Sequence, residues 1–248
     1  MFARDSVAWR VNAEAALLLG GGRALLMQVA HPKVAQGVAE HSDFERDPIA
    51  RLNRTLELSL TLGFGSGEEV RRAARTINRT HERVRGRGYS ASDPELLLWV
   101  HATLIDSSIK TYREFVGRLS PVDAATYYEE TKPVGSLLGI PPAAFPPSYA
   151  DFQAYVEGML SRDARPDATG RRLARVVLRP SIRHVPSFVY APLHVITAGL
   201  LPGPLRDAYG LRWGGAERAL YAAARTAVRG AVRVAPAALR QVPQARQS

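Results

Sequence analysis

The chain has 248 residues, 46% of them hydrophobic, and a formal net charge of +10 that comes almost entirely from arginine. This length and apolar content suit one large globular domain better than two small ones. Without cysteine, disulfides, zinc fingers and iron–sulfur clusters are excluded, so any metal must be held by the six histidines or by carboxylates. The positive charge favours nucleic acid, an anionic membrane surface or an anionic cofactor as partner. The alternative is that the arginines lie on solvated helix faces and bind no anionic partner.

The two most apolar stretches of the sequence lack the pattern of a membrane span or an export signal. Residues 15–30 are interrupted by glycines and by Arg23, well short of the roughly 20 apolar residues that a bilayer demands. Residues 185–205 are interrupted by four prolines. We therefore expect a soluble, cytoplasmic protein without a signal peptide or transmembrane helix.

In chain order, the predicted elements are all helical. Helices are expected at 9–19, 23–30 and 33–40, then, after a loop at 41–48, at 49–62 and 67–85. A turn at 86–90 precedes a helix at 94–113, capped by Asp93 and started by Pro94. Further helices are expected at 120–138, 149–160, 171–177 and 214–232, separated by proline-rich segments at 139–148 and 180–204. No alternating strand pattern occurs, so the sequence predicts an all-α, single multi-helix domain over 1–248, with a frayed tail at about 235–248.

The helices at 49–62 and 67–85 are joined by a glycine-rich turn and carry the most unusual pattern. At about 100° per residue, His81 lies in one arc with Val70, Ala74 and Ile77. A stripe of arginines lies on the opposite side of the same helix, at positions 72, 75, 79 and 83. A histidine that faces the core needs a partner inside the protein.

The preceding helix has a similar feature. Arg51 and Thr55 are one turn apart and share an arc with Leu58 and Leu62. An arginine on such a face is costly to bury unless an anionic or strongly polar group meets it. A single buried, charged, metal-bearing cofactor would satisfy both helices.

The other histidines offer rival ligands, although an inward histidine is more often a hydrogen-bonded core residue. His101 lies at the centre of the apolar face of the helix at 94–113. His31 and His41 lie on either side of the segment 34–40 and could line the same cavity. His184 and His194 belong to no recognisable group. Zinc is disfavoured because there is no HExxH motif and no histidine pair at i,i+4 spacing. A non-haem iron site with two histidines and a carboxylate stays open. Haem fits best, because it needs one axial histidine, an apolar cage and basic groups for its propionates.

Several other functions are disfavoured. The glycine runs at 20–23 and 63–67 lack the strand and lysine of nucleotide-binding loops, so we interpret them as helix caps and close-packing points. There is no Gly-x-Ser-x-Gly elbow for a serine hydrolase. Nucleic-acid binding through the arginine stripe is disfavoured because a polar recognition face is lacking. A peripheral contact of the basic helix at 216–232 with anionic lipid stays open.

Three passages resemble a known family. They are RALLMQVAHPKVAQGVAEHSDFERDPIARLNRT at 23–55, INRTHERVRG at 77–86 and YSASDPELLLWVHATLIDS at 89–107. Their pattern is similar to that of the haem-dependent oxygenases that include rubber oxygenase (latex clearing protein) and MpaB. The resemblance implies an all-α fold that binds haem b and its iron, with 9–113 as the haem-binding core. It places the axial histidine of the HxxVR pattern on His81 and turns Arg51, Arg54 and Thr55 toward the pocket.

The resemblance also implies an activity. The expected function is an oxidoreductase that uses dioxygen on an apolar, unsaturated small molecule, smaller than rubber. Gly86 replaces a histidine of the rubber-cleaving members, the chain is shorter than theirs, and we expect it to lack their export signal. His31, His41 and His101 are secondary candidates for the pocket wall or a second axial position. Two axial histidines would favour electron transfer or sensing over oxygenation. The alternative function is a non-enzymatic basic helical module that binds nucleic acid or an anionic membrane surface.

Overall fold

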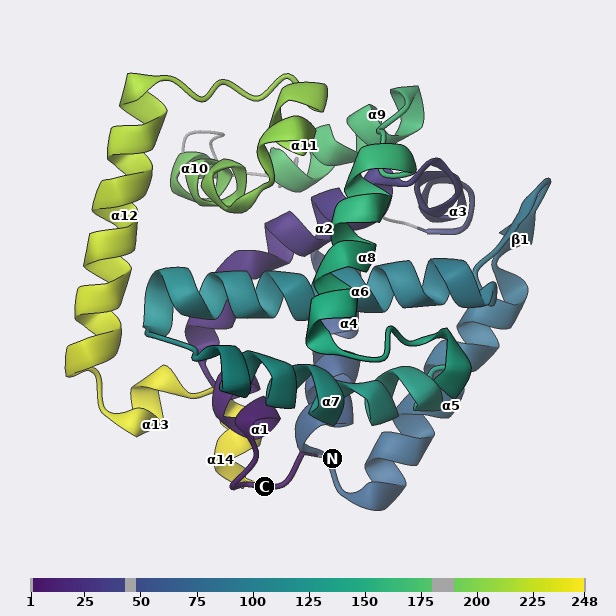
Figure 1. The fold of residues 1–248 in the computed structure, drawn as a ribbon, viewed down its shortest axis with the longest axis horizontal. Coiled ribbons are helices and arrows are strands. Elements are labelled where there is room, and N and C mark those ends of the chain that lie inside the picture. The colour runs from purple at the N-terminus through teal and green to yellow at the C-terminus, as the bar shows by residue number, and fades with distance from the viewer. Residues whose placement is uncertain (1, 43–47, 180–189, 248) are drawn as a thin grey trace.

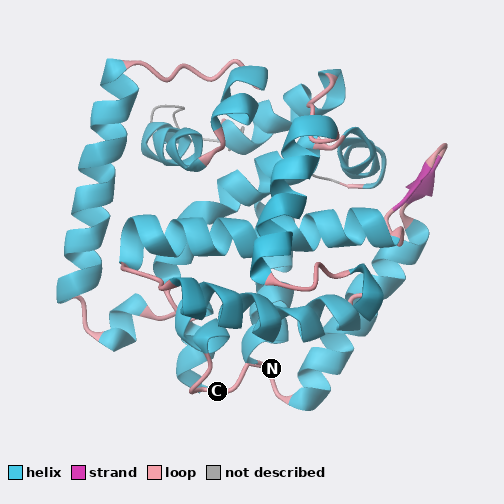
Figure 2. Cartoon of the chain, viewed as in Figure 1, coloured by secondary structure: helices cyan, strands magenta, loops and turns pink. Residues whose placement is uncertain are grey.

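A computed structural model describes residues 2–42, 48–179 and 190–247, with only the backbone of residues 48–52 and 247. The described chain is predominantly helical, which confirms the predicted all-α fold (Figure 1; Figure 2). Its first half holds α1 (Val7–Asn12), η1 (Ala15–Gly20), α2 (Gly21–Ala30), α3 (Pro32–His41), α4 (Pro48–Phe64), α5 (Gly67–Arg83) and α6 (Pro94–Thr111). Its second half holds η3 (Tyr112–Val116), α7 (Pro121–Leu137), η4 (Pro142–Ala144), α8 (Tyr149–Arg162), α9 (Ala168–Leu178), α10 (Ala191–Leu200), α11 (Gly203–Ala208), α12 (Gly215–Val234), α13 (Ala237–Arg240) and α14 (Pro243–Gln247).

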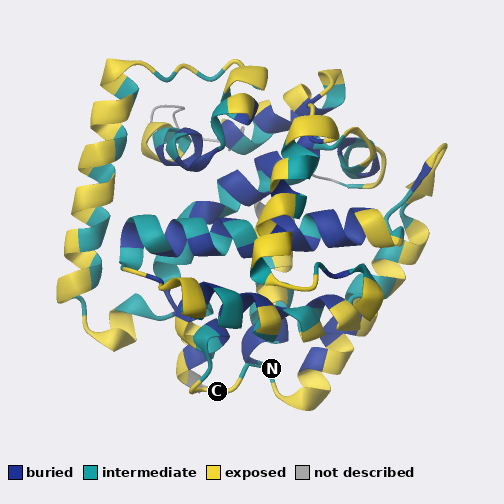
Figure 3. Ribbon diagram, viewed as in Figure 1, coloured by how far each residue is buried: buried dark blue, intermediate teal, exposed yellow. Residues whose placement is uncertain are grey.

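Helix α6 is the central element of the fold. The side chain of Asp93 accepts a hydrogen bond from the Glu95 amide at 3.0 Å and caps the helix, as predicted. Buried residues such as Trp99 and Ala102 occur along nearly its whole length, and it packs against α2, α7 and α8 (Figure 3). Each large apolar side chain buried in this way contributes roughly 1.5–3 kcal/mol. The surrounding helices therefore fix α6 and every side chain that it carries.

Helices α4 and α5 form an antiparallel pair beside this core (Figure 1). Ser66 and Glu69 make a capping box that starts α5, in which the Ser66 amide donates to the Glu69 carboxylate at 2.8 Å. Leu62, Val70 and Ala74 are buried between the two helices, and residues at the end of α7 pack against them. These contacts determine which side of α5 faces inward.

One local prediction was wrong. The single helix expected at 9–19 is divided into α1 and η1, because the backbone of Glu14 is extended and pairs with Gln241. The glycines after it are helix caps and close-packing points, as predicted. Helix η1 ends at Gly20 and α2 begins at Gly21, and Gly20 and Gly22 pack closely against the side chains of Thr111 and Thr197.

A short hairpin occupies the predicted turn at 86–90. Its strands, β1 (Arg85–Gly86) and β2 (Tyr89–Ser90), contain two residues each and are joined through Gly88, whose φ is +82°. Such short strands contain no alternation that a sequence pattern could reveal. A β-carbon on Gly86 would lie 2.5 Å from the Tyr89 ring, so glycine allows this ring to cross the hairpin.

The C-terminal segment packs against the start of the chain. Where the sequence predicts a frayed tail, α13 and α14 occur, and Val242 and Ala245 are buried in a cluster with Ala13 and Phe64. Arg240 forms an ion pair with Glu14 at 3.0 Å. The predicted loop at 41–48 and the proline-rich segment at 180–204, including His184, lie partly outside the described residues, and α10 and α11 occupy the end of that segment.

Within residues 2–42, 48–179 and 190–247, no helix is long and apolar enough to cross a bilayer.

Candidate functional site

His81 lies on the inner side of α5. Its side chain is half-buried, whereas the four arginines of the predicted stripe are exposed. Its Nδ1 atom is buried and has no hydrogen-bond partner among the described residues. Burial lowers the pKa of His81, so the ring is neutral at pH 7 and keeps a lone pair for a metal ion. An inward, neutral imidazole with an unpaired nitrogen is suited to metal ligation.

Asn78 lies one turn before His81 on the same helix and was not singled out by the sequence. Its Nδ2 atom donates to the carbonyl of Leu137 at 3.0 Å, which ties α5 to the end of α7. Its Oδ1 atom is buried and, like Nδ1 of His81, has no partner within the described ranges. The sequence contained one signal for Asn78: a spacing of three residues places it next to His81 on one face of the helix.

The RxxRT motif lies on α4. The apolar contacts that bury this helix come from its second half, where Leu58, Leu60 and Leu62 pack on neighbouring helices. In the first half Arg54 and Thr55 are exposed. The predicted burial of Thr55 with Leu62 is therefore wrong for this structure, because the described apolar contacts of α4 lie in its second half. The Arg51 side chain lies outside the described residues.

His101 is buried, as its position on the apolar face of α6 predicts, with 8% of its surface exposed. Its Nε2 atom has no partner in the described part of the chain, and its ring makes an edge contact with Phe145 at 6.1 Å between centroids. Burial lowers the pKa of His101 to about 4, against the opposing effect of a hydrogen bond with the Thr131 backbone. A β-carbon on Gly135 would lie 3.0 Å from Nε2, so α7 closes over this nitrogen.

His31 and His41 lie at opposite ends of α3. His31 is half-buried with an unpaired Nδ1, and burial lowers its pKa while nearby Asp163 acts in the opposite direction. His41 is exposed, and its Nε2 lies 3.1 Å from the carbonyl oxygen of Arg85 in the hairpin. No group of three histidines or carboxylates that could hold a metal occurs among the described residues. The structure therefore does not bring the candidate histidines together in one cluster.

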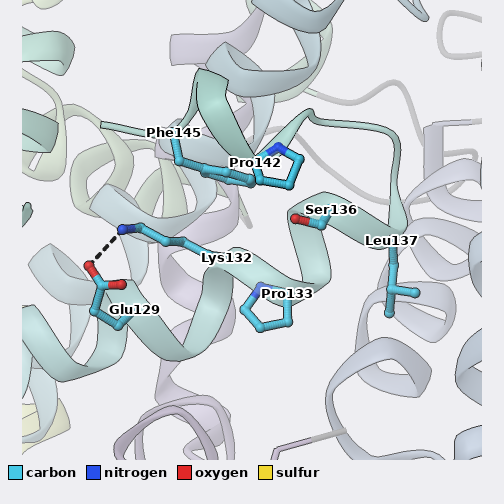
Figure 4. Close-up of a pocket in the computed structure, with 7 residues that line it drawn as sticks. All are labelled: Glu129, Lys132, Pro133, Ser136, Leu137, Pro142 and Phe145. Atoms are coloured by element: carbon cyan, nitrogen blue, oxygen red, sulfur yellow. Dashed lines mark hydrogen bonds and ion pairs between the residues drawn. The ribbon is translucent and has the colours of Figure 1, made fainter. Parts of the chain in front are cut away.

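An open groove of about 740 Å³ lies between α7 and η4 (Figure 4). Its wall is mainly apolar, and its one ion pair among the lining residues joins Lys132 to Glu129 at 2.7 Å. Phe145, whose ring contacts buried His101, forms one side of it. The residues that line it are Glu129, Lys132, Pro133, Ser136, Leu137, Pro142 and Phe145. The carbonyl of Leu137 accepts the hydrogen bond from Asn78, so this end of the groove borders α5.

A buried arginine in the first of the three quoted passages has a structural role that the sequence did not reveal. Arg23 is 5% exposed and donates to the carbonyl of Leu200 at 2.8 Å, to Ser107 Oγ at 2.7 Å and to Asp106 Oδ2 at 2.6 Å. It joins α2, α6 and α10. The signal was a charged residue inside an apolar run, but its partners are 83 or more residues away.

The comparisons with known proteins agree with this architecture. Residues 9–230 match the family described as the catalytic domain of ER-bound oxygenase mpaB/B′ and rubber oxygenase, and the chain belongs to that family. It is 28% identical over 207 residues to uncharacterized protein Mb2261 of Mycobacterium bovis and to uncharacterized protein Rv2237 of Mycobacterium tuberculosis. Each alignment covers 78% of this chain and 80% of the relative. No solved structure matches the chain.

Family membership defines the class of protein. The family consists of oxygenases, so the chain is an oxidoreductase by family, with dioxygen and an oxidisable molecule as its substrates. The rubber oxygenase family is in general associated with haem.

The residues of this chain fit a haem in two respects. His81 offers a neutral imidazole with an unpaired buried nitrogen next to an apolar cluster, and exposed Arg54 lies on the paired helix.

Proposed function

We propose that this protein is a haem-b-dependent oxygenase that acts with dioxygen on an apolar, unsaturated small molecule of the isoprenoid or lipid type. The observation that carries the proposal is the buried, unpaired Nδ1 of His81 on the inner side of α5. Family membership supplies the reaction class. The groove between α7 and η4 offers an apolar surface next to α5 along which such a substrate would approach.

Each candidate residue has a separate task in this proposal. His81 would hold the iron through a ring nitrogen, and its lowered pKa keeps the ring neutral at pH 7, with a lone pair on one nitrogen. Arg51, Arg54 and Thr55 on α4 would hold a propionate or stabilise negative charge that develops on oxygen. Arg54 and Thr55 are exposed in the structure, so a bound haem would have to cover them before fixed donors could act strongly in a site that excludes water. The haem, when bound, supplies the oxygen chemistry. His31, His41 and His101 remain candidates for the pocket wall.

The test is the absorption spectrum of protein produced with a haem precursor. Wild-type protein is expected to show a Soret band, and His81→Ala is expected to lose it while its helical circular dichroism is unchanged. His194→Ala is the matched control, because His194 is a half-buried histidine outside the proposed site and its loss should leave the band intact. Added imidazole should restore the band in His81→Gly. A band that persists in both His81 variants would move the ligand elsewhere.

The oxygenase activity is tested separately. Haem-loaded protein with intact His81 should consume dioxygen in the presence of a suitable alkene, and carbonyl or hydroxylated products should be found by mass spectrometry. Wild-type protein that stays colourless after reconstitution with haem would overturn the proposal.

A further inference from the structure

The outer side of α5 carries a row of arginines. At about 100° per residue, Arg72, Arg75, Arg79 and Arg83 fall within an arc of roughly 80°, and all four are exposed. Arg72 is paired with Glu68 at 2.9 Å, whereas the other three have no ion pair among the described residues. We call Arg75, Arg79 and Arg83 the arginine face. Unpaired charges held on one rigid helix form a preset docking surface for an anionic partner.

The arginine face lies on the opposite side of α5 from His81. The same periodicity places the ring roughly 160° from the centre of that face, and an α-helix is only about 10–12 Å across. We propose that the arginine face docks an acidic, one-electron carrier protein that reduces the haem iron held by His81. This inference rests on the function proposed above, and it assigns that function an electron donor.

A membrane surface does not fit the arginine face. A helix that binds at a bilayer interface inserts large apolar side chains between the lipids. None of the large exposed apolar side chains of the described residues lies on α5, whose apolar residues pack against α4 and α7. The partner must therefore be contacted through charge, without insertion.

Nucleic acid also fits poorly. The hydroxyls of Thr76 and Thr80, which lie between the arginines, donate to carbonyls of their own helix at 3.0 Å and are not available to read bases. Three unpaired arginines would neutralise roughly three phosphates, fewer than the 6–10 contacts of tight complexes. A compact acidic protein needs only a small complementary patch for fast, steered association.

The electron transfer step is balanced. The reduced carrier would lose one electron, and the ferric haem held by His81 would accept it, with no bond formed or broken and no proton moved. The carrier is the external reductant, and it leaves oxidised by one electron. The arginine face only binds and orients the carrier, so its residues are docking residues and not catalytic ones.

The first arm of the test measures binding. Calorimetry with an acidic plant-type [2Fe–2S] ferredoxin is done on wild-type protein, on Arg75→Glu/Arg79→Glu/Arg83→Glu and on the three Gln replacements. The Glu variant is expected to weaken binding at least about tenfold and the Gln variant less, and salt should weaken wild-type binding. The control is the matched triple Glu variant of Arg118, Arg171 and Arg175, which are exposed arginines on other elements with the same charge change.

Equal weakening in both triple Glu variants, or no salt-dependent binding of ferredoxin to wild-type protein, would overturn the proposal. So would tighter binding of a short single-stranded oligonucleotide through the same three arginines. The binding arm does not require haem, so it stands even if the Soret band is absent and the proposed oxygenase function fails.

The second arm uses haem-loaded protein and follows the spectral change on reduction. Reduced ferredoxin should reduce the Glu variant of the arginine face at least about tenfold more slowly than wild type, whereas dithionite, which needs no docking surface, should reduce both at similar rates. A normal Soret band with unchanged reduction by ferredoxin would refute the electron donor while leaving the oxygenase proposal intact.

Discussion

Replacing Arg23 with methionine should cost about 3 kcal/mol of unfolding free energy. The Arg23 side chain is 6% exposed and donates to three acceptors on α6 and α10, whereas that of Asp106 keeps 28% exposure. Removing one member of a buried pair typically costs 3–5 kcal/mol, and the water that still reaches Asp106 places the value at the lower end, about 3 kcal/mol. For a chain of this size the midpoint of thermal unfolding should fall by roughly 6–12 °C.

The assay is calorimetric or circular-dichroism unfolding, with Arg10→Met as the control. Arg10 pairs with Asp123 at 3.0 Å, but the two side chains are 50% and 33% exposed, so this change should cost less than about 1 kcal/mol. Asp106→Asn should be at least as costly as Arg23→Met, because it leaves the more deeply buried charge without its partner. If Arg23→Met shifted the midpoint no more than Arg10→Met, the reasoning that Arg23 anchors α2 to α6 would be refuted.

Other buried contacts predict effects of pH, packing and truncation. Because the pKa of His101 is about 4 in the folded protein and 6.5 in the unfolded chain, acid favours unfolding. Stability should hold above pH 6.5 and fall by up to about 3 kcal/mol toward pH 4 in urea titrations, and His101→Leu should flatten this slope. Gly135→Ala should cost about 1–3 kcal/mol by crowding His101, whereas Gly230→Ala, where a β-carbon meets open space, should gain about 0.5–1 kcal/mol. Equal effects would contradict the packing argument. Ending the chain at 235 removes buried Val242 and should cost about 2 kcal/mol, whereas an unchanged unfolding midpoint would support a frayed tail.

Local patterns were sufficient to predict the central helices α5 and α6 and the sides that they bury. The predicted helix at 67–85 corresponds to α5, and Val70, Ala73 and Ala74, which periodicity placed inward, are all buried. His101 was likewise predicted inside. These successes have one cause: helical periodicity is a local property, so a single helix carries the information about which of its sides is apolar.

Contacts between distant segments could not be predicted in this way. Helical periodicity placed Thr55 inward because it shares an arc with Leu62, yet Thr55 is exposed and the described apolar contacts of α4 lie in its second half. The partners of Arg23 and the closure of Gly135 over His101 join residues far apart in sequence. The extended backbone at Glu14 depends on Gln241 at the other end of the chain. The pattern of a single helix is therefore enough to predict a candidate ligand. The residues that line its site depend on how several helices pack together.

The exposed first half of α4 allows a direct test of where the haem binds. Amide exchange in 53–57 should be fast in haem-free protein, because Arg54 and Thr55 are exposed and the described apolar contacts of α4 lie in its second half. If His81 and the RxxRT motif flank one cofactor, haem should slow exchange in 53–57 by about tenfold or more, since a bound ligand stabilises the elements that contact it. Exchange in α12, which lies at the far edge of the molecule from α5 (Figure 1), is the internal control. Protection that appeared near His101 and left 53–57 unchanged would separate the RxxRT motif from the haem and transfer the site to α6 and α7.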